Sequence, residues 1–137
     1  TRVPTTVVEI EDRQVGKRGG ELHPAPWEPF RPRYRGGWKL RPGESITVPV
    51  VAGGPTASID LELSRGSRLA GEVEVEARLG ERVLGRWPVG AARGWQTLRL
   101  GSVPWSPGAR LELEIRSPGA GSPGTQVILD RVRFRWP

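Results

Sequence analysis

The chain has no cysteine, no methionine and only one histidine among its 137 residues. Disulfides and thiolate metal sites are therefore excluded, and so is a zinc site built from histidine and cysteine. A Ser-His-Asp or Cys-His catalytic site would depend on His23 in the run LHPAPW, and the sequence has no Gly-x-Ser-x-Gly elbow. A carboxylate pair of the glycosidase kind stays open, but most acidic residues fall on outward strand positions, such as Glu72, Glu74 and Glu112. We therefore expect a protein that is not an enzyme.

Long hydrophobic runs are also missing. No apolar run approaches the roughly 18 residues of a membrane span, so we expect no membrane insertion by this domain. The first residues, TRVPTTVVEIED, lack the apolar core of a signal peptide. The length suits one domain, and we expect residues 1–137 to be a single domain excised from a larger protein.

Basic residues outnumber acidic ones by 21 to 15, which gives a formal net charge of +6. Only Lys17 and Lys39 are lysines, so the other nineteen are arginines. With 19 glycines and 14 prolines, this composition indicates a GC-rich or heat-adapted (thermophile) genome rather than a function. A basic balance permits nucleic acid or anionic glycans as partners. Because acidic residues are interleaved with the arginines, the charge alone does not indicate nucleic-acid binding.

Alternation of apolar and polar residues with a period of two dominates the chain. It predicts half-buried strands over 45–51, 58–64, 71–79 and 110–117, and irregular strands over 82–89 and 95–100. Gly, Pro and Ser bound each run, and no segment has a helical period. The pattern predicts an all-β protein: an antiparallel, two-sheet β-sandwich of the jelly-roll kind with about nine strands.

The two ends of the chain carry acidic residues in strand-like runs. VVEIED (7–12) places Glu9 and Glu11 on one face, and QVILDRVRFRW (126–136) changes its apolar phase at Leu129-Asp130-Arg131, which predicts a β-bulge. If the two strands are neighbours, Glu9, Glu11 and Asp130 can converge into an oxygen cage that suits calcium. The alternative is that both glutamates face solvent and pair with nearby arginines.

These motifs resemble a known family. The E-x-E-D strand, the Gly-Gly pair, WQTLRL and the closing LDRVRF are similar to the galactose-binding-like jelly roll, and closest to non-catalytic carbohydrate-binding modules of families six, thirty-five and thirty-six. The resemblance implies a structural calcium held by Glu9, Glu11 and Asp130. It also implies a glycan as the partner.

Residues 12–36 are a long stretch with little alternation, and such a loop is usually either functional or packed. Aromatic faces stack on sugar rings and arginines bind carboxylates, so the segment and its continuation suit an acidic glycan. The expected ligand-binding residues are Trp27, Arg31, Arg33, Tyr34, Arg35 and Trp38. In the alternative, Trp38 belongs to the core and the other aromatics pin a structural strap. We favour the strap for Trp38 and the binding site for Tyr34.

The sequence therefore predicts a non-catalytic carbohydrate-binding accessory module, extracellular or at the cell surface. Its parent would be a glycan-active protein, a glycoside hydrolase or a membrane glycosyltransferase. Two other functions stay open. One is a structural or protein-interaction domain without a sugar site, and the other is a polyanion or nucleic-acid binder that uses the arginines of 29–36.

Overall fold

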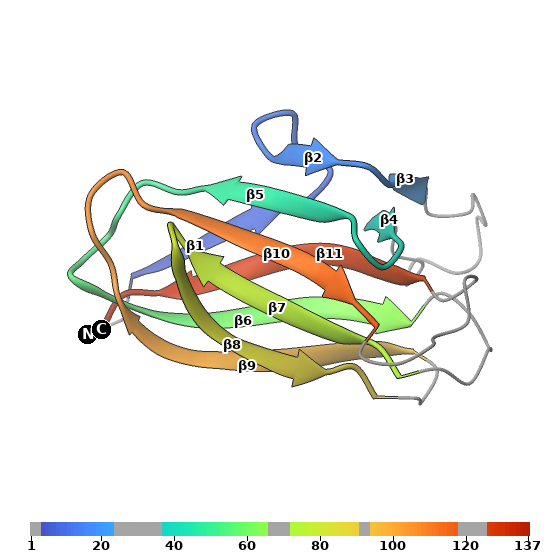
Figure 1. The fold of residues 1–137 in the computed structure, drawn as a ribbon. Coiled ribbons are helices and arrows are strands. Elements are labelled where there is room, and N and C mark those ends of the chain that lie inside the picture. The colour runs from blue at the N-terminus through green and yellow to red at the C-terminus, as the bar shows by residue number, and fades with distance from the viewer. Residues whose placement is uncertain (1–3, 24–36, 66–71, 91–93, 118–125) are drawn as a thin grey trace.

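The computed structural model describes residues 4–23, 37–65, 72–90, 94–117 and 126–137. Within these ranges all regular secondary structure is β-strand, and eleven strands form two antiparallel sheets (Figure 1). This confirms the predicted β-sandwich. The two strands beyond the predicted nine are three residues long each, too short to show alternation in the sequence. The described part of the chain contains no helix that is long and apolar enough to cross a membrane.

The first sheet is built around the last strand of the chain. Its order is β3-β4-β11-β6-β9, and β1 also pairs with β11. The bounds are β1 (Thr5–Glu9), β3 (Glu21–His23), β4 (Gly37–Leu40), β6 (Thr56–Arg65), β9 (Trp95–Pro104) and β11 (Val127–Arg135). Because β6 runs along one edge of β11, β4 and β1 share the other edge, with β4 beside 127–129 and β1 beside 131–135.

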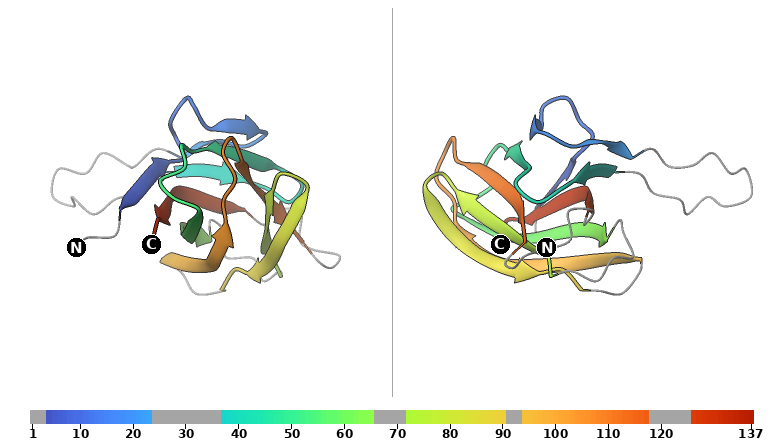
Figure 2. Two further views of the ribbon diagram at one scale, coloured as in Figure 1. Left: turned by 90° about the vertical axis from the view of Figure 1, so that its left-hand side faces the viewer. Right: turned by 45° about the vertical axis from the view of Figure 1, so that its right-hand side comes forward.

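The second sheet has the order β2-β5-β10-β7-β8. The bounds are β2 (Gly16–Arg18), β5 (Ser45–Pro49), β7 (Glu74–Leu79), β8 (Arg82–Pro88) and β10 (Arg110–Arg116). The two sheets lie face to face, as the views turned from Figure 1 show (Figure 2). Both edges of β5 are used, because β10 pairs along its whole length and β2 pairs with its first three residues.

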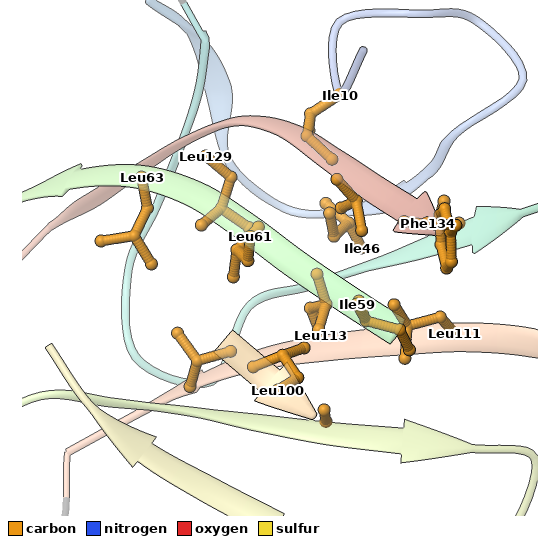
Figure 3. Close-up of a cluster of buried hydrophobic side chains, with 14 of the residues drawn as sticks. Ile10, Ile46, Ile59, Leu61, Leu63, Leu100, Leu111, Leu113, Leu129 and Phe134 are labelled. Carbon is orange, nitrogen blue, oxygen red and sulfur yellow. The ribbon is translucent and has the colours of Figure 1, made fainter. Parts of the chain in front are cut away.

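The alternation of the sequence gives the core directly. The inward residues of the central strands are almost completely buried: Ile46, Val48, Ile59, Leu61, Leu63, Val75, Ala77, Leu111, Leu113 and Ile115. Figure 3 shows part of this core, with Ile46, Ile59, Leu61, Leu63, Leu111 and Leu113 labelled. Burial of this apolar surface is the main stabilising contribution, at roughly 25 cal/mol per Å² removed from water. The strands predicted from alternation are therefore confirmed, with ends that differ by a few residues.

The phase change predicted in the last strand is a bulge. In the pairing of β11 with β6, Leu129 lies opposite Leu63 and Arg131 opposite Glu62, so Asp130 is the extra residue. The bulge lets the strand bury side chains of both phases, Val127 and Leu129 before it and Val132 and Phe134 after it. Asp130 itself is only 5% exposed.

Three aromatic rings close one end of the core. Trp105 contacts Phe134 and Trp136 edge-on, at centroid distances of 5.4 and 5.6 Å, and Phe134 stacks on Trp136 at 5.9 Å. The Trp136 indole N–H donates a hydrogen bond to Thr6 Oγ1 at 3.0 Å, which ties the last strand to β1. Trp105, which follows directly after β9, is only 5% exposed because it completes this cluster.

The outer face of the second sheet carries a network of ion pairs across β10, β7 and β8. At its centre Glu76 is only 2% exposed, although its position in the alternation points it outward. Arg78, Arg86 and Arg116 bond its carboxylate at 2.9, 3.0 and 3.1 Å, and they cover it. Burial by itself raises the pKa of Glu76, but hydrogen bonds from Arg86 and Arg116 outweigh it and lower the pKa below its ordinary value.

We expect Glu76→Gln to lower the free energy of unfolding by about 2 kcal/mol at neutral pH, because it removes the charge that three guanidinium groups share. The pKa of Glu76 is lower in the folded state, so this stability is present above the ordinary value of 4.5 and is lost as pH falls through the folded-state pKa. Urea unfolding from neutral to acidic pH measures the effect. Glu81→Gln, in the exposed turn between β7 and β8, is the control. A deficit that stays constant down to the lowest pH would contradict the assignment.

Candidate functional site

The structure describes only one of the six predicted ligand-binding residues. Trp27, Arg31, Arg33, Tyr34 and Arg35 lie outside the described residues, so their assignment to a glycan site stays a prediction. Trp38 lies in β4, opposite Leu22 of β3 and Leu129 of β11.

The contacts of Trp38 are those of a packed residue. Its half-buried ring packs against the core, and its indole N–H donates a hydrogen bond to the Gly19 carbonyl at 3.0 Å. Lys17 Nζ lies 4.9 Å from the ring centroid, a cation–π distance. Gly20 has a φ of +82°, and a Cβ there would lie 2.4 Å from the indole nitrogen. Segment 16–20 therefore covers this ring closely, which favours the structural interpretation of Trp38.

The residues predicted to hold calcium come from adjoining strands. β1 pairs with β11, and the Ile10 N–H donates a hydrogen bond to the Asp130 carbonyl at 2.9 Å. Glu9 ends β1, whereas Glu11 lies exposed in the following turn. The predicted neighbourhood of Glu9 and Asp130 is therefore present. Among the described residues, however, no group of three or more acidic, histidine or cysteine side chains could hold a metal ion.

A guanidinium group occupies the position between these carboxylates. Arg131 Nε is buried and lies 3.1 Å from Glu62 Oε2, 3.4 Å from Asp130 Oδ2 and 3.5 Å from Glu9 Oε1. These are ion-pair contacts that lack hydrogen-bond geometry. The carboxylates thus already converge on a cation that belongs to the chain. As described, the residues do not fit a calcium ion at this point, and calcium binding stays a prediction.

A groove follows the edge of β1 that faces away from β11. It has a volume of about 560 Å³ and is formed by β1, the turn after it, the end of β5 and the residues that lead into β10. Volumes of roughly 300–1,000 Å³ are typical of small-ligand sites. Sequence reasoning did not find this groove, because it depends on which strand edges lie opposite each other. The exposed apolar residue in β1, Val7, was the only local signal.

No family model matches the sequence, and no curated protein matches it either. Solved structures do match. The CBM36-1 domain of a multidomain xylanase from the hindgut metagenome of Trinervitermes trinervoides aligns with a TM-score of 0.65 and 18% identity, over 98% of each chain. A CBM36 carbohydrate-binding module in complex with calcium and xylotriose aligns with a TM-score of 0.60 and 18% identity, over 94% of this chain and 98% of the other. This chain has the jelly-roll fold of these carbohydrate-binding modules.

The same fold also occurs inside larger glycan-active proteins. The chain aligns over 99% of its length with 28% of a GH87 α-1,3-glucanase catalytic-domain structure, at a TM-score of 0.68 and 11% identity. It aligns equally far with 35% of a family two carbohydrate esterase from Cellvibrio japonicus, at a TM-score of 0.62 and 15% identity. At these identities the likeness establishes the fold alone. The predicted jelly-roll fold of a carbohydrate-binding module is confirmed by the alignments with two CBM36 domains; these alignments do not show a specific likeness to families six or thirty-five.

We expect Trp38→Ala to lower the free energy of unfolding by roughly 3 kcal/mol, because it removes a large ring packed between segment 16–20 and the core. Trp38→Phe keeps an aromatic ring but loses the N–H donor to Gly19 and part of the packed volume, so we expect a smaller cost of about 1–2 kcal/mol. Chemical denaturation of the three proteins measures both values. Lost glycan binding with unchanged stability in Trp38→Ala would instead support the predicted ligand contact.

Addition of calcium should leave the melting temperature of the wild type equal to that of a chelated sample, because Arg131 already supplies the cation. In Arg131→Ala the three carboxylates lose that cation. We expect this variant to melt lower in chelator and to gain stability with calcium, by ~2.7 kcal/mol at a hundredfold excess over the dissociation constant. Differential scanning calorimetry measures the four samples.

Arg133→Ala is the matched control for this experiment. Arg133 lies two residues further along β11, opposite Val7 of β1 and Asp60 of β6, outside the carboxylate cluster. Its loss should create no calcium response. A wild-type melting temperature that rises with calcium, and no longer does so in Asp130→Ala, would contradict the role of Arg131 and support the predicted metal site.

Proposed function

We propose that this chain is a non-catalytic carbohydrate-binding module of a larger glycan-active protein, and that it works outside the cytoplasm. The observation that carries the proposal is the alignment over nearly the full length of both chains with carbohydrate-binding domains, one of them solved with xylotriose. The alignments with parts of a glucanase and an esterase support the accessory role. In such a protein the module would hold the catalytic domain close to its polysaccharide.

The sequence supports the absence of catalysis. It has no cysteine and one histidine, so a Cys-His pair is excluded and a Ser-His pair would depend on His23 alone. Several carboxylates of the described outer faces are held in ion pairs between strands, as in the Glu76 network and around Arg131. Glycan binding by this chain would not use a metal ion at these carboxylates, because the guanidinium group of Arg131 already lies among them.

A glycan array followed by affinity electrophoresis in polysaccharide gels tests the proposal. We expect retention by at least one polysaccharide, no release of reducing sugar, and retention that persists when the salt concentration is raised. A polyanion binder would instead lose its affinity steeply with salt, because counterion release drives that binding. Tyr34→Ala, assayed beside Trp38→Ala, tests the site expected from the sequence.

The absence of retention by any glycan, from a protein shown to be folded by circular dichroism, would contradict the proposed function. It would favour the structural or protein-interaction domain. Retention that salt abolishes, with nucleic acid as the better ligand, would favour the polyanion binder.

A further inference from the structure

The groove beside β1 combines exposed apolar surface with a concave shape. Two of the four large hydrophobic side chains that are exposed in the described chain line it, Val7 at 44% and Val51 at 89%. They come from β1 and from the segment after β5, so they lie on opposite sides of the groove, and Pro49 adds a third apolar surface. Exposed apolar groups gathered in one hollow indicate a binding site more than scattered ones do.

The same groove also contains polar groups that are available to form hydrogen bonds with a ligand. Gln14 and Arg110 are exposed, and within the described chain their side chains make no hydrogen bond or ion pair. The backbone of Val7 adds a donor and an acceptor. The Pro4 carbonyl accepts a hydrogen bond from the Trp136 N–H, and the Ile10 N–H donates one to the Asp130 carbonyl. In an antiparallel pair every second residue bonds the partner strand, so the even-numbered residues of β1 bond β11. The N–H and C=O of Val7 therefore point away from β11, toward the groove.

The lining distinguishes between possible ligands. Glu9 and Asp12, two acidic residues, line the groove together with a single basic residue, Arg110, so the formal charge of the lining disfavours an acidic chain. A peptide that adds a strand to β1 would need a run of free backbone groups, but the Glu9 carbonyl already accepts a hydrogen bond from the Asp12 N–H at 3.0 Å. A neutral sugar chain needs only apolar surface for its C–H faces and separate polar groups for its hydroxyls.

We propose that the groove between β1 and the β5–β10 edge binds a neutral oligosaccharide, with Gln14, Arg110 and the Val7 backbone bonding hydroxyls and with Val7 and Val51 contacting the ring faces. This inference rests on the proposed function and gives it a location and a ligand class. The acidic-glycan site expected from Arg31, Arg33 and Arg35 would be a different site on the same chain.

The experiment compares two double variants. Gln14→Ala with Arg110→Ala removes the two free polar side chains of the groove. Thr97→Ala with Arg99→Ala removes two exposed side chains from β9, the strand at the opposite edge of the first sheet. Isothermal titration calorimetry uses xylohexaose, cellohexaose and laminarihexaose as neutral probes, hexagalacturonate as the acidic probe, and a short basic β-forming peptide. Melting temperatures confirm that both variants are folded.

We expect the wild type to bind a neutral hexasaccharide, the groove variant to bind it about tenfold more weakly, and the β9 variant to bind it within about twofold of wild type. Equal binding by the groove variant, or binding of hexagalacturonate or the peptide alone, would overturn the inference. If the groove variant binds normally while the array shows a glycan ligand, the proposed function stands without this site. If no glycan binds on the array or in solution, both are overturned.

Discussion

The bulge at Asp130 is the constraint on which the first sheet depends. β11 lies at the centre of that sheet, and one of its edges pairs with β4 before the bulge and with β1 after it. β6 runs along the other edge and shifts register at the same place. Without the extra residue, either Val127 and Leu129 or Val132 and Phe134 would face solvent, because a change of one residue reverses every side chain in a strand.

The bulge also organises the charges around it. It places the buried Asp130 beside Arg131, whose guanidinium lies among carboxylates from β1 and β6 as well. One side chain therefore links three strands through charge, at the point where β11 changes its partner from β4 to β1. The second sheet has the same kind of network with the charges reversed: one carboxylate, that of Glu76, pairs with three arginines. In both sheets charged groups cross from strand to strand, which is effective only where the partners are partly buried.

The sequence predicted what depends on local periodicity and missed what depends on strand pairing. Alternation gave the inward faces of β5, β6 and β10, and the change of phase gave the bulge at Asp130. The short strands β2 and β3 show no alternation of apolar and polar residues. They form because they pair with the edges of β5 and β4. Three features depend on at least one pair of residues that are far apart in the chain: Arg131 with Glu9, Glu76 with Arg116, and the groove between β1 and β10. No local pattern encodes such neighbours.

The distribution of charge also explains where a ligand can be recognised. The described outer faces of both sheets are crossed by ion pairs, so a sugar ring lying flat over them would displace charged groups from their partners. In the groove beside β1, by contrast, the side chains of Gln14 and Arg110 have no such partners among the described residues. β1 turns one side of its backbone toward β11 and the other toward open space, and Val7 and Val51 stay exposed there because no further strand covers them. A protein that stabilises its sheet faces with charge leaves its strand edges, and the segments between strands, as the surfaces available for binding.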